Sequence, residues 1–93
     1  MYVLFLEFTL PELADQATLE ALYHLERLFV GVAGVTNTRL LQNSEDQKVM
    51  LLEITSQADL LQAVQTSDLS LENVKTRVWG FEVLNTPNRL PRA

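Results

Sequence analysis

Three segments of this chain are apolar on both faces of the strands that they predict. Residues 2–8, 49–54 and 78–84 each carry hydrophobic side chains at odd and at even positions. Successive side chains of a strand point to opposite faces of a sheet, and an antiparallel sheet with one face in water normally alternates apolar and polar residues. A sheet built from these strands therefore needs cover on both faces, and this requirement constrains the fold more than any other feature.

The segment between the first two strands predicts a long amphipathic helix. From Pro11 to Phe29, hydrophobic residues recur at three- and four-residue spacing, and a glycine-containing stretch then ends the pattern. Residues 35–42 and 48–55 predict two strands joined by a polar hairpin loop. These two strands are expected to be antiparallel neighbours.

The second half of the chain again predicts a helix followed by a strand. Ser56, three residues before Asp59, predicts the N-cap of a second helix of about three turns. A last strand over residues 74–84 completes the order β-α-β-β-α-β, which is ferredoxin-like. We therefore predict an α+β domain over residues 1–84 with a four-stranded antiparallel sheet, and an extended C-terminal tail over residues 85–93.

Composition excludes several classes of function. The chain has no cysteine, which removes thiolate metal sites, and its single histidine, His24, has no partners at metal-ligand spacing. The net charge of −5 and the scattered basic residues argue against nucleic-acid binding. No apolar run is long enough to be a membrane span, and no phosphate-binding loop is present. We expect a cytoplasmic protein without metal, cofactor, nucleic-acid or membrane partner.

The second apolar face of the sheet predicts a homodimer. In a monomer it would leave five hydrophobic residues exposed: Val3, Phe5, Val49, Leu51 and Val78. Soluble monomers rarely expose a contiguous apolar patch of that size. The alternative is that the tail or a loop of the same chain covers this face.

Three glutamates interrupt the apolar strands and are the candidate catalytic carboxylates. Parity allows Glu7, Glu53 and Glu82 to share the face opposite the helices, and Arg39 is placed to reach Glu53 across the hairpin. Glu7 and Glu53 on an enclosed face would suit general acid and base roles, with His24 as a further candidate. The alternative is that the glutamates form ion pairs between subunits at the rim of the sheet and that His24 is an ordinary exposed helix residue.

Aromatic residues suggest a site for a flat hydrophobic ligand. We expect Trp79, on the parity of Arg77, to pack under the helices, and to line a ligand cavity there together with Tyr2, Tyr23 and Phe29. Arg39 is a further candidate ligand-binding residue. The alternative is that these residues only complete the core.

The stretch from Leu25 to Ile54 resembles the dimeric α+β barrel proteins, and most of all their antibiotic-biosynthesis-monooxygenase type. It contains a helix end, a Gly34-Val turn, a strand, a polar hairpin and the strand Val-Met-Leu-Leu-Glu-Ile, followed by a Ser-led helix. The resemblance implies two ferredoxin-like units with their sheets face to face. The chain departs from the family at Thr55, where an aromatic residue is frequent.

A second resemblance, to the small effector-binding domains of leucine-responsive-type regulators, lies in the Gly34-Val and Asn73-Val starts of two strands. The first resemblance implies a small-molecule-binding barrel that acts as a cofactor-independent monooxygenase or isomerase on an aromatic or polyketide-like compound. The second implies a non-catalytic module that binds an effector or another protein. The residues leave both hypotheses open.

Overall fold

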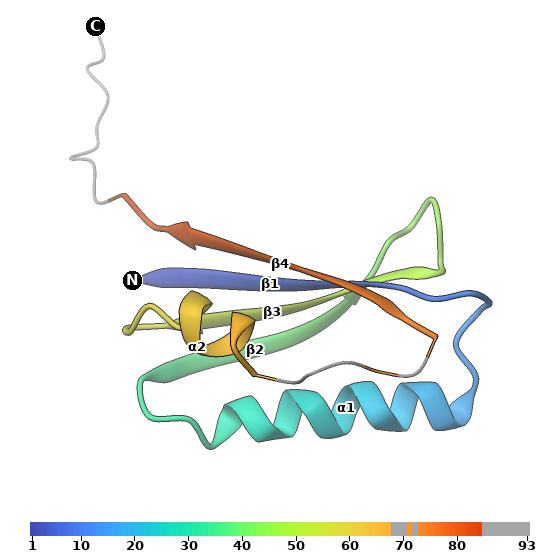
Figure 1. The fold of residues 1–93 in the computed structure, drawn as a ribbon, viewed down its shortest axis with the longest axis horizontal. Helices are drawn as coiled ribbons and strands as arrows, with labels where there is room; N and C mark the ends of the chain where they lie inside the picture. Colours follow the sequence, from blue (N-terminus) through green and yellow to red (C-terminus); the bar gives the residue numbers. More distant parts are fainter. Residues whose placement is uncertain (68–70, 72, 85–93) are drawn as a thin grey trace, which may run out of the picture.

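The computed structural model describes residues 1–67, 71 and 73–84 of the chain. Four strands and two helices follow one another as β1 (Tyr2–Thr9), α1 (Gln16–Val30), β2 (Val35–Gln42), β3 (Val49–Ser56), α2 (Leu61–Gln65) and β4 (Lys75–Glu82). The strands form one antiparallel sheet in the order β2-β3-β1-β4, with both helices on the same side (Figure 1). The predicted α+β class and the four-stranded antiparallel sheet are confirmed, and the arrangement is compatible with a ferredoxin-like fold.

The hydrophobic core lies between the sheet and α1. Even-numbered residues of the two central strands point into it, among them Leu6, Phe8 and Leu52, and from α1 it receives Leu22 and others. These side chains are almost fully buried, so the space between the sheet and α1 is filled. A closely packed interior of this kind leaves little room for a ligand.

Helix α1 begins later than the hydrophobic spacing predicts. It starts at Gln16 rather than Pro11 because Asp15 is its N-cap, and the Asp15 carboxylate accepts a 2.8 Å hydrogen bond from the Thr18 backbone N–H. This bond also lowers the pKa of Asp15. A side-chain cap replaces the missing intrahelical partner of that N–H, so the helix begins where the cap is available.

Helix α2 is shorter than predicted and begins after a different residue. Ser56 is not its N-cap: it is the last residue of β3, it is buried, and its hydroxyl donates to the Ala58 carbonyl. The helix covers only Leu61–Gln65, and the Asp59 carboxylate accepts a 3.1 Å hydrogen bond from the Leu61 N–H at its start. Ser56 continues the ladder with β1 instead of capping the helix.

The residues before β2 and β4 share an unusual backbone conformation. Gly34 has φ 90° and Asn73 has φ 62°, and each directly precedes a valine that leads into a strand. Glycine and asparagine are the residues that adopt positive φ most readily. The similarity between the two halves of the sequence therefore includes a residue with positive φ before each of these valines.

No helix in the described part of the chain is long and apolar enough to cross a bilayer. The predicted tail over residues 85–93 lies outside the described residues.

Candidate functional site

The face of the sheet that points away from the helices is the candidate site. We call it the open face, and it consists of the odd-numbered residues of the four strands except Val35, which a register shift in β2 places on the helix side. Four hydrophobic residues expected there are present, namely Val3, Phe5, Val49 and Leu51. The fifth, Val78, is a correction, because it packs against the core on the opposite face.

Trp79 lies on the open face. The sequence-based prediction that it packs under the helices is wrong. It pairs with Phe5 across the ladder, and its side chain is 40% exposed. The reason is Gly80, whose position under α2 would bring an added Cβ within 3.0 Å of the Leu61 side chain. Because a side chain at position 80 would crowd Leu61, the large aromatic neighbours of Gly80 point the other way.

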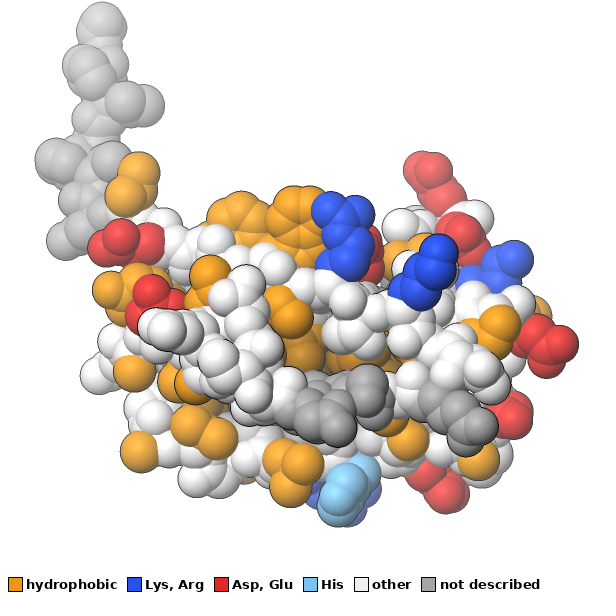
Figure 2. Space-filling model, in the orientation of Figure 1, with side chains coloured by type: hydrophobic (Ala, Val, Ile, Leu, Met, Phe, Trp, Pro, Cys, Tyr) orange, Lys and Arg blue, Asp and Glu red, His pale blue; other side chains and the backbone are white. Residues whose placement is uncertain are grey.

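An aromatic and cationic cluster therefore lies on β1 and β4. Phe5 and Phe81 are in edge-to-face contact, with ring centroids 5.7 Å apart and planes at 76°. The Arg77 guanidinium lies over the Trp79 ring, with its carbon 4.3 Å from the centroid. Hydrophobic side chains lie beside a Lys/Arg side chain over β4, on the side away from α1 (Figure 2).

Two of the three predicted carboxylates share the open face with this cluster. Glu53 is paired with Arg39, its partner in the ladder, at 2.7 Å between Arg39 Nη2 and Glu53 Oε1, so the predicted cross-hairpin contact is confirmed. Glu7 lies opposite Arg77, at 3.9 Å. Glu82 is a correction: it pairs with Tyr2 and has the parity of Gly80, which places it on the helix side of the sheet.

The Glu7–Arg77 contact was missed from the sequence, although a signal for it exists. Arg77 and Trp79 have the same parity, so a correct face for one would have placed both. The aromatic residues Trp79 and Phe81 flank a glycine in the strand. Gly80 was the informative residue, since glycine inside a strand often marks a close approach of another element.

The remaining predicted site residues lie on the other layer. Tyr23 and His24 are exposed on α1, and Phe29 is buried against the core on the same helix. The sheet separates these residues from Trp79, Glu7 and Glu53. One cavity cannot be lined by both groups, so the predicted ligand site that joined Trp79 to Tyr23 and Phe29 does not form.

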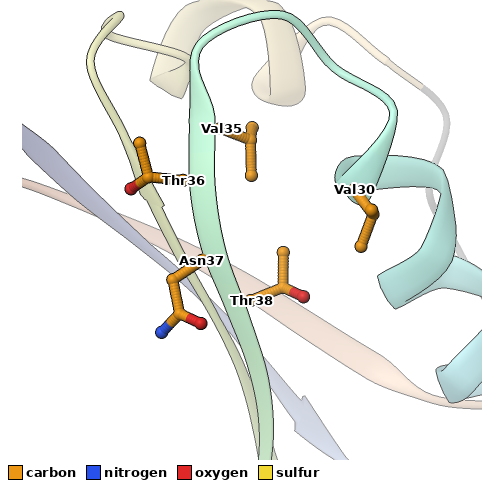
Figure 3. A pocket seen from close by; sticks show the side chains of 5 residues that line it. All are labelled: Val30, Val35, Thr36, Asn37 and Thr38. Atoms are coloured by element: carbon orange, nitrogen blue, oxygen red, sulfur yellow. The ribbon is translucent and has the colours of Figure 1, made fainter.

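Two of the hollows at the margins of the helix layer lie near predicted site residues or the edge strand. One, of about 170 Å³, lies between the end of α1 and α2, and Phe29 is among its lining residues. The other, of about 230 Å³, lies between α1 and the edge strand β2, where Val35 and Thr38 point toward Val30 (Figure 3). Thr38 is already occupied, because its hydroxyl donates to Glu26 Oε2 at 2.9 Å. Neither hollow contains a free charged group suited to catalysis.

A metal site is not found: among the described residues, no group of three or more histidine and acidic side chains is close enough to hold an ion. In comparisons with known proteins, no family model, curated protein or solved structure matches this chain. The resemblance to the antibiotic-biosynthesis-monooxygenase type stays a hypothesis.

Proposed function

We propose that this chain is a homodimeric binding module in which two copies pack their open faces together and form an α+β barrel around a small-molecule site. The observation that carries the proposal is the apolar open face. Phe81 is 52% exposed and Trp79 is 40% exposed, next to Phe5 and Val3. Side chains of this size on one contiguous face are typical of an interaction surface.

The open face is large enough for a stable dimer. Each of the four strands has eight residues. At about 3.3 Å per residue and about 4.8 Å between strands, the flat face measures roughly 500 Å² per copy, and the side chains add relief. Two such faces remove at least about 1,000 Å² from water, which reaches the size that a specific interface needs.

The charges of the open face also permit two copies to meet. The whole chain has a net charge of −5, which would make two copies repel each other. The open face differs, because its three basic residues (Arg39, Lys75 and Arg77) accompany two acidic ones (Glu7 and Glu53). Its acidic residues each lie beside an arginine, so two open faces approach without opposing blocks of negative charge.

Binding is a better-supported role than catalysis. Acid–base chemistry needs proton donors and acceptors within reach of one substrate. His24 lies on the outer layer of α1, whereas Glu7 and Glu53 lie on the open face, so these three predicted catalytic residues do not converge. Glu53 is also already held by Arg39. A non-catalytic small-molecule or effector module requires none of these groups to cooperate.

The proposal is tested by the solution mass of two charge variants. Phe81→Glu introduces a charge into the open face, and Leu28→Glu introduces the same charge on α1 at a residue that is 55% exposed, close to the 52% of Phe81. Because both side chains are half exposed in the monomer, neither substitution removes a core contact. We expect the native chain and Leu28→Glu to be dimers and Phe81→Glu to be a monomer, measured by light scattering over a dilution series.

Two results would contradict the proposal. If the native chain is monomeric at every concentration, the open face is not a dimer interface. A dimer that is lost in Leu28→Glu and kept in Phe81→Glu is formed through the helix layer instead.

A further inference from the structure

The two arginines of the open face differ in how their guanidinium groups are satisfied. Arg39 forms a 2.7 Å hydrogen bond with Glu53. Arg77 Nη1 is 3.9 Å from Glu7 Oε1, which exceeds hydrogen-bond distance, and within residues 1–67, 71 and 73–84 its side chain donates no hydrogen bond. Arg77 is instead held by the face of Trp79, which orients the guanidinium, and its N–H groups have no hydrogen-bond acceptor in the part of the chain that the structure describes.

Aromatic surface surrounds this oriented cation. Trp79 and Phe81 lie two residues apart on the same face of β4, and Phe5 lies opposite Trp79 on β1. Phe5 and Phe81 are in contact with each other. The three rings therefore make a continuous apolar surface beside Arg77. Trp79 is 40% exposed and Phe81 is 52% exposed, so much of this surface is accessible.

The open face carries one basic side chain more than its acidic ones. Arg39, Lys75 and Arg77 stand against Glu7 and Glu53. Lys75 has the same parity as Arg77 and lies two residues before it on β4, so the surplus positive charge is at this side of the sheet. Enclosing an uncompensated charge is costly, and one anion per copy would remove that cost.

We propose that the open face binds a planar aromatic carboxylate, with Arg77 holding the carboxylate and the rings of Trp79, Phe81 and Phe5 contacting the aromatic part. This inference rests on the proposed homodimer, whose second copy closes the site. A guanidinium binds a carboxylate through two parallel N–H donors, and rings of this kind favour a flat apolar partner. The ligand class thus follows from the two chemistries that the cluster places side by side.

The test uses titration calorimetry on the full chain with 2-naphthoate as the probe. Two control compounds each lack one recognised feature: 2-naphthylmethanol has the ring without the charge, and cyclohexanecarboxylate has the charge without the planar ring. We expect 2-naphthoate to bind at least about tenfold more tightly than either control, as a charge-assisted hydrogen bond or a stacking contact allows. Equal binding of all three compounds would overturn the inference.

Two variants locate the site on the sheet. We expect Arg77→Gln to weaken 2-naphthoate binding about tenfold or more and to leave 2-naphthylmethanol binding unchanged. Arg27→Gln removes an exposed arginine of α1 and is expected to bind 2-naphthoate as the native chain does. A loss that is equal in the two variants would show a general charge effect and overturn the assignment to Arg77.

The solution mass of each sample separates the two proposals. A native dimer that does not bind 2-naphthoate overturns the ligand inference and leaves the dimer intact. A native monomer overturns the dimer and, with it, the enclosed site. If Arg77→Gln stays a dimer and loses only 2-naphthoate, both proposals are supported independently.

Discussion

Single residues decide where the elements of this protein begin and which way they face. Asp15 starts α1, Gly34 and Asn73 each supply a turn with positive φ, and Gly80 lies against Leu61. Each role follows from a local property: a side-chain acceptor, a backbone freedom or the absence of a Cβ. Asp15 is the one among them whose role depends on pH.

We expect the stability of the folded chain at low pH to depend on the ionisation of the Asp15 carboxyl group. Its pKa in the folded chain lies below the ordinary 3.8 because the charged form accepts the Thr18 N–H, so its contribution is present above that value and is lost as pH falls through the lowered pKa. Asp15→Asn keeps an acceptor that does not titrate. We expect the native chain to lose thermal stability relative to Asp15→Asn as pH falls below 3.8.

Differential scanning calorimetry at a series of pH values measures this difference. Asp15→Ala is the control, because it removes the cap at every pH and should be less stable than Asp15→Asn throughout. A constant gap between the native chain and Asp15→Asn would show that the carboxylate charge contributes nothing to the cap.

Among the elements, α2 depends most on one close approach. Its Leu61 side chain packs over Gly80 of β4, where an added Cβ would lie 3.0 to 3.3 Å from three Leu61 carbons. These distances are tighter than ordinary van der Waals contact, so a larger residue forces α2 to move. We expect Gly80→Ala to lower the free energy of unfolding by about 1–3 kcal/mol, the usual cost of overpacking.

Denaturant unfolding of two alanine variants tests this expectation. Gly31 caps α1 with φ −84°, and an added Cβ there would meet only one atom, at 3.8 Å. Gly31→Ala should therefore be neutral or stabilising by less than about 1 kcal/mol. If Gly80→Ala is equally harmless, α2 is not held against β4 as tightly as the distances indicate.

At the scale of the whole molecule, one side of the sheet is covered and the other is bare. Helices bury the even-numbered residues, and the odd-numbered residues of the open face include half-exposed Trp79 and Phe81. If a second copy covers them, association stabilises the folded state by mass action. We expect the thermal midpoint to rise by about 3–5 °C for each tenfold increase in chain concentration.

The Phe81→Glu variant provides the contrast for this measurement. Its midpoint should not depend on concentration, whereas that of Leu28→Glu should follow the native chain. A native midpoint that is constant across concentrations would mean that folding does not require a partner.

Much of the fold and part of the candidate site are readable in the sequence. Runs of apolar and β-favouring residues bounded by turn residues place every strand to within two residues at each end. The cross-hairpin pair Arg39–Glu53 is also predictable, since a short polar loop sets the register of the two strands that it joins. The need for cover on both faces is also readable in the sequence, because three strands carry apolar residues at odd and at even positions.

Only the tertiary structure decides which face of β4 is the open one. Both parities of this strand are apolar, so periodicity gives no preference between Trp79 and Val78. The choice is made by the packing of α2 against β4. An added Cβ at Gly80 would crowd the Leu61 side chain, so the side of β4 that carries Gly80 faces α2. That packing turns Trp79 and Arg77 toward Phe5 and Glu7, and in this way places the aromatic and cationic cluster on the open face.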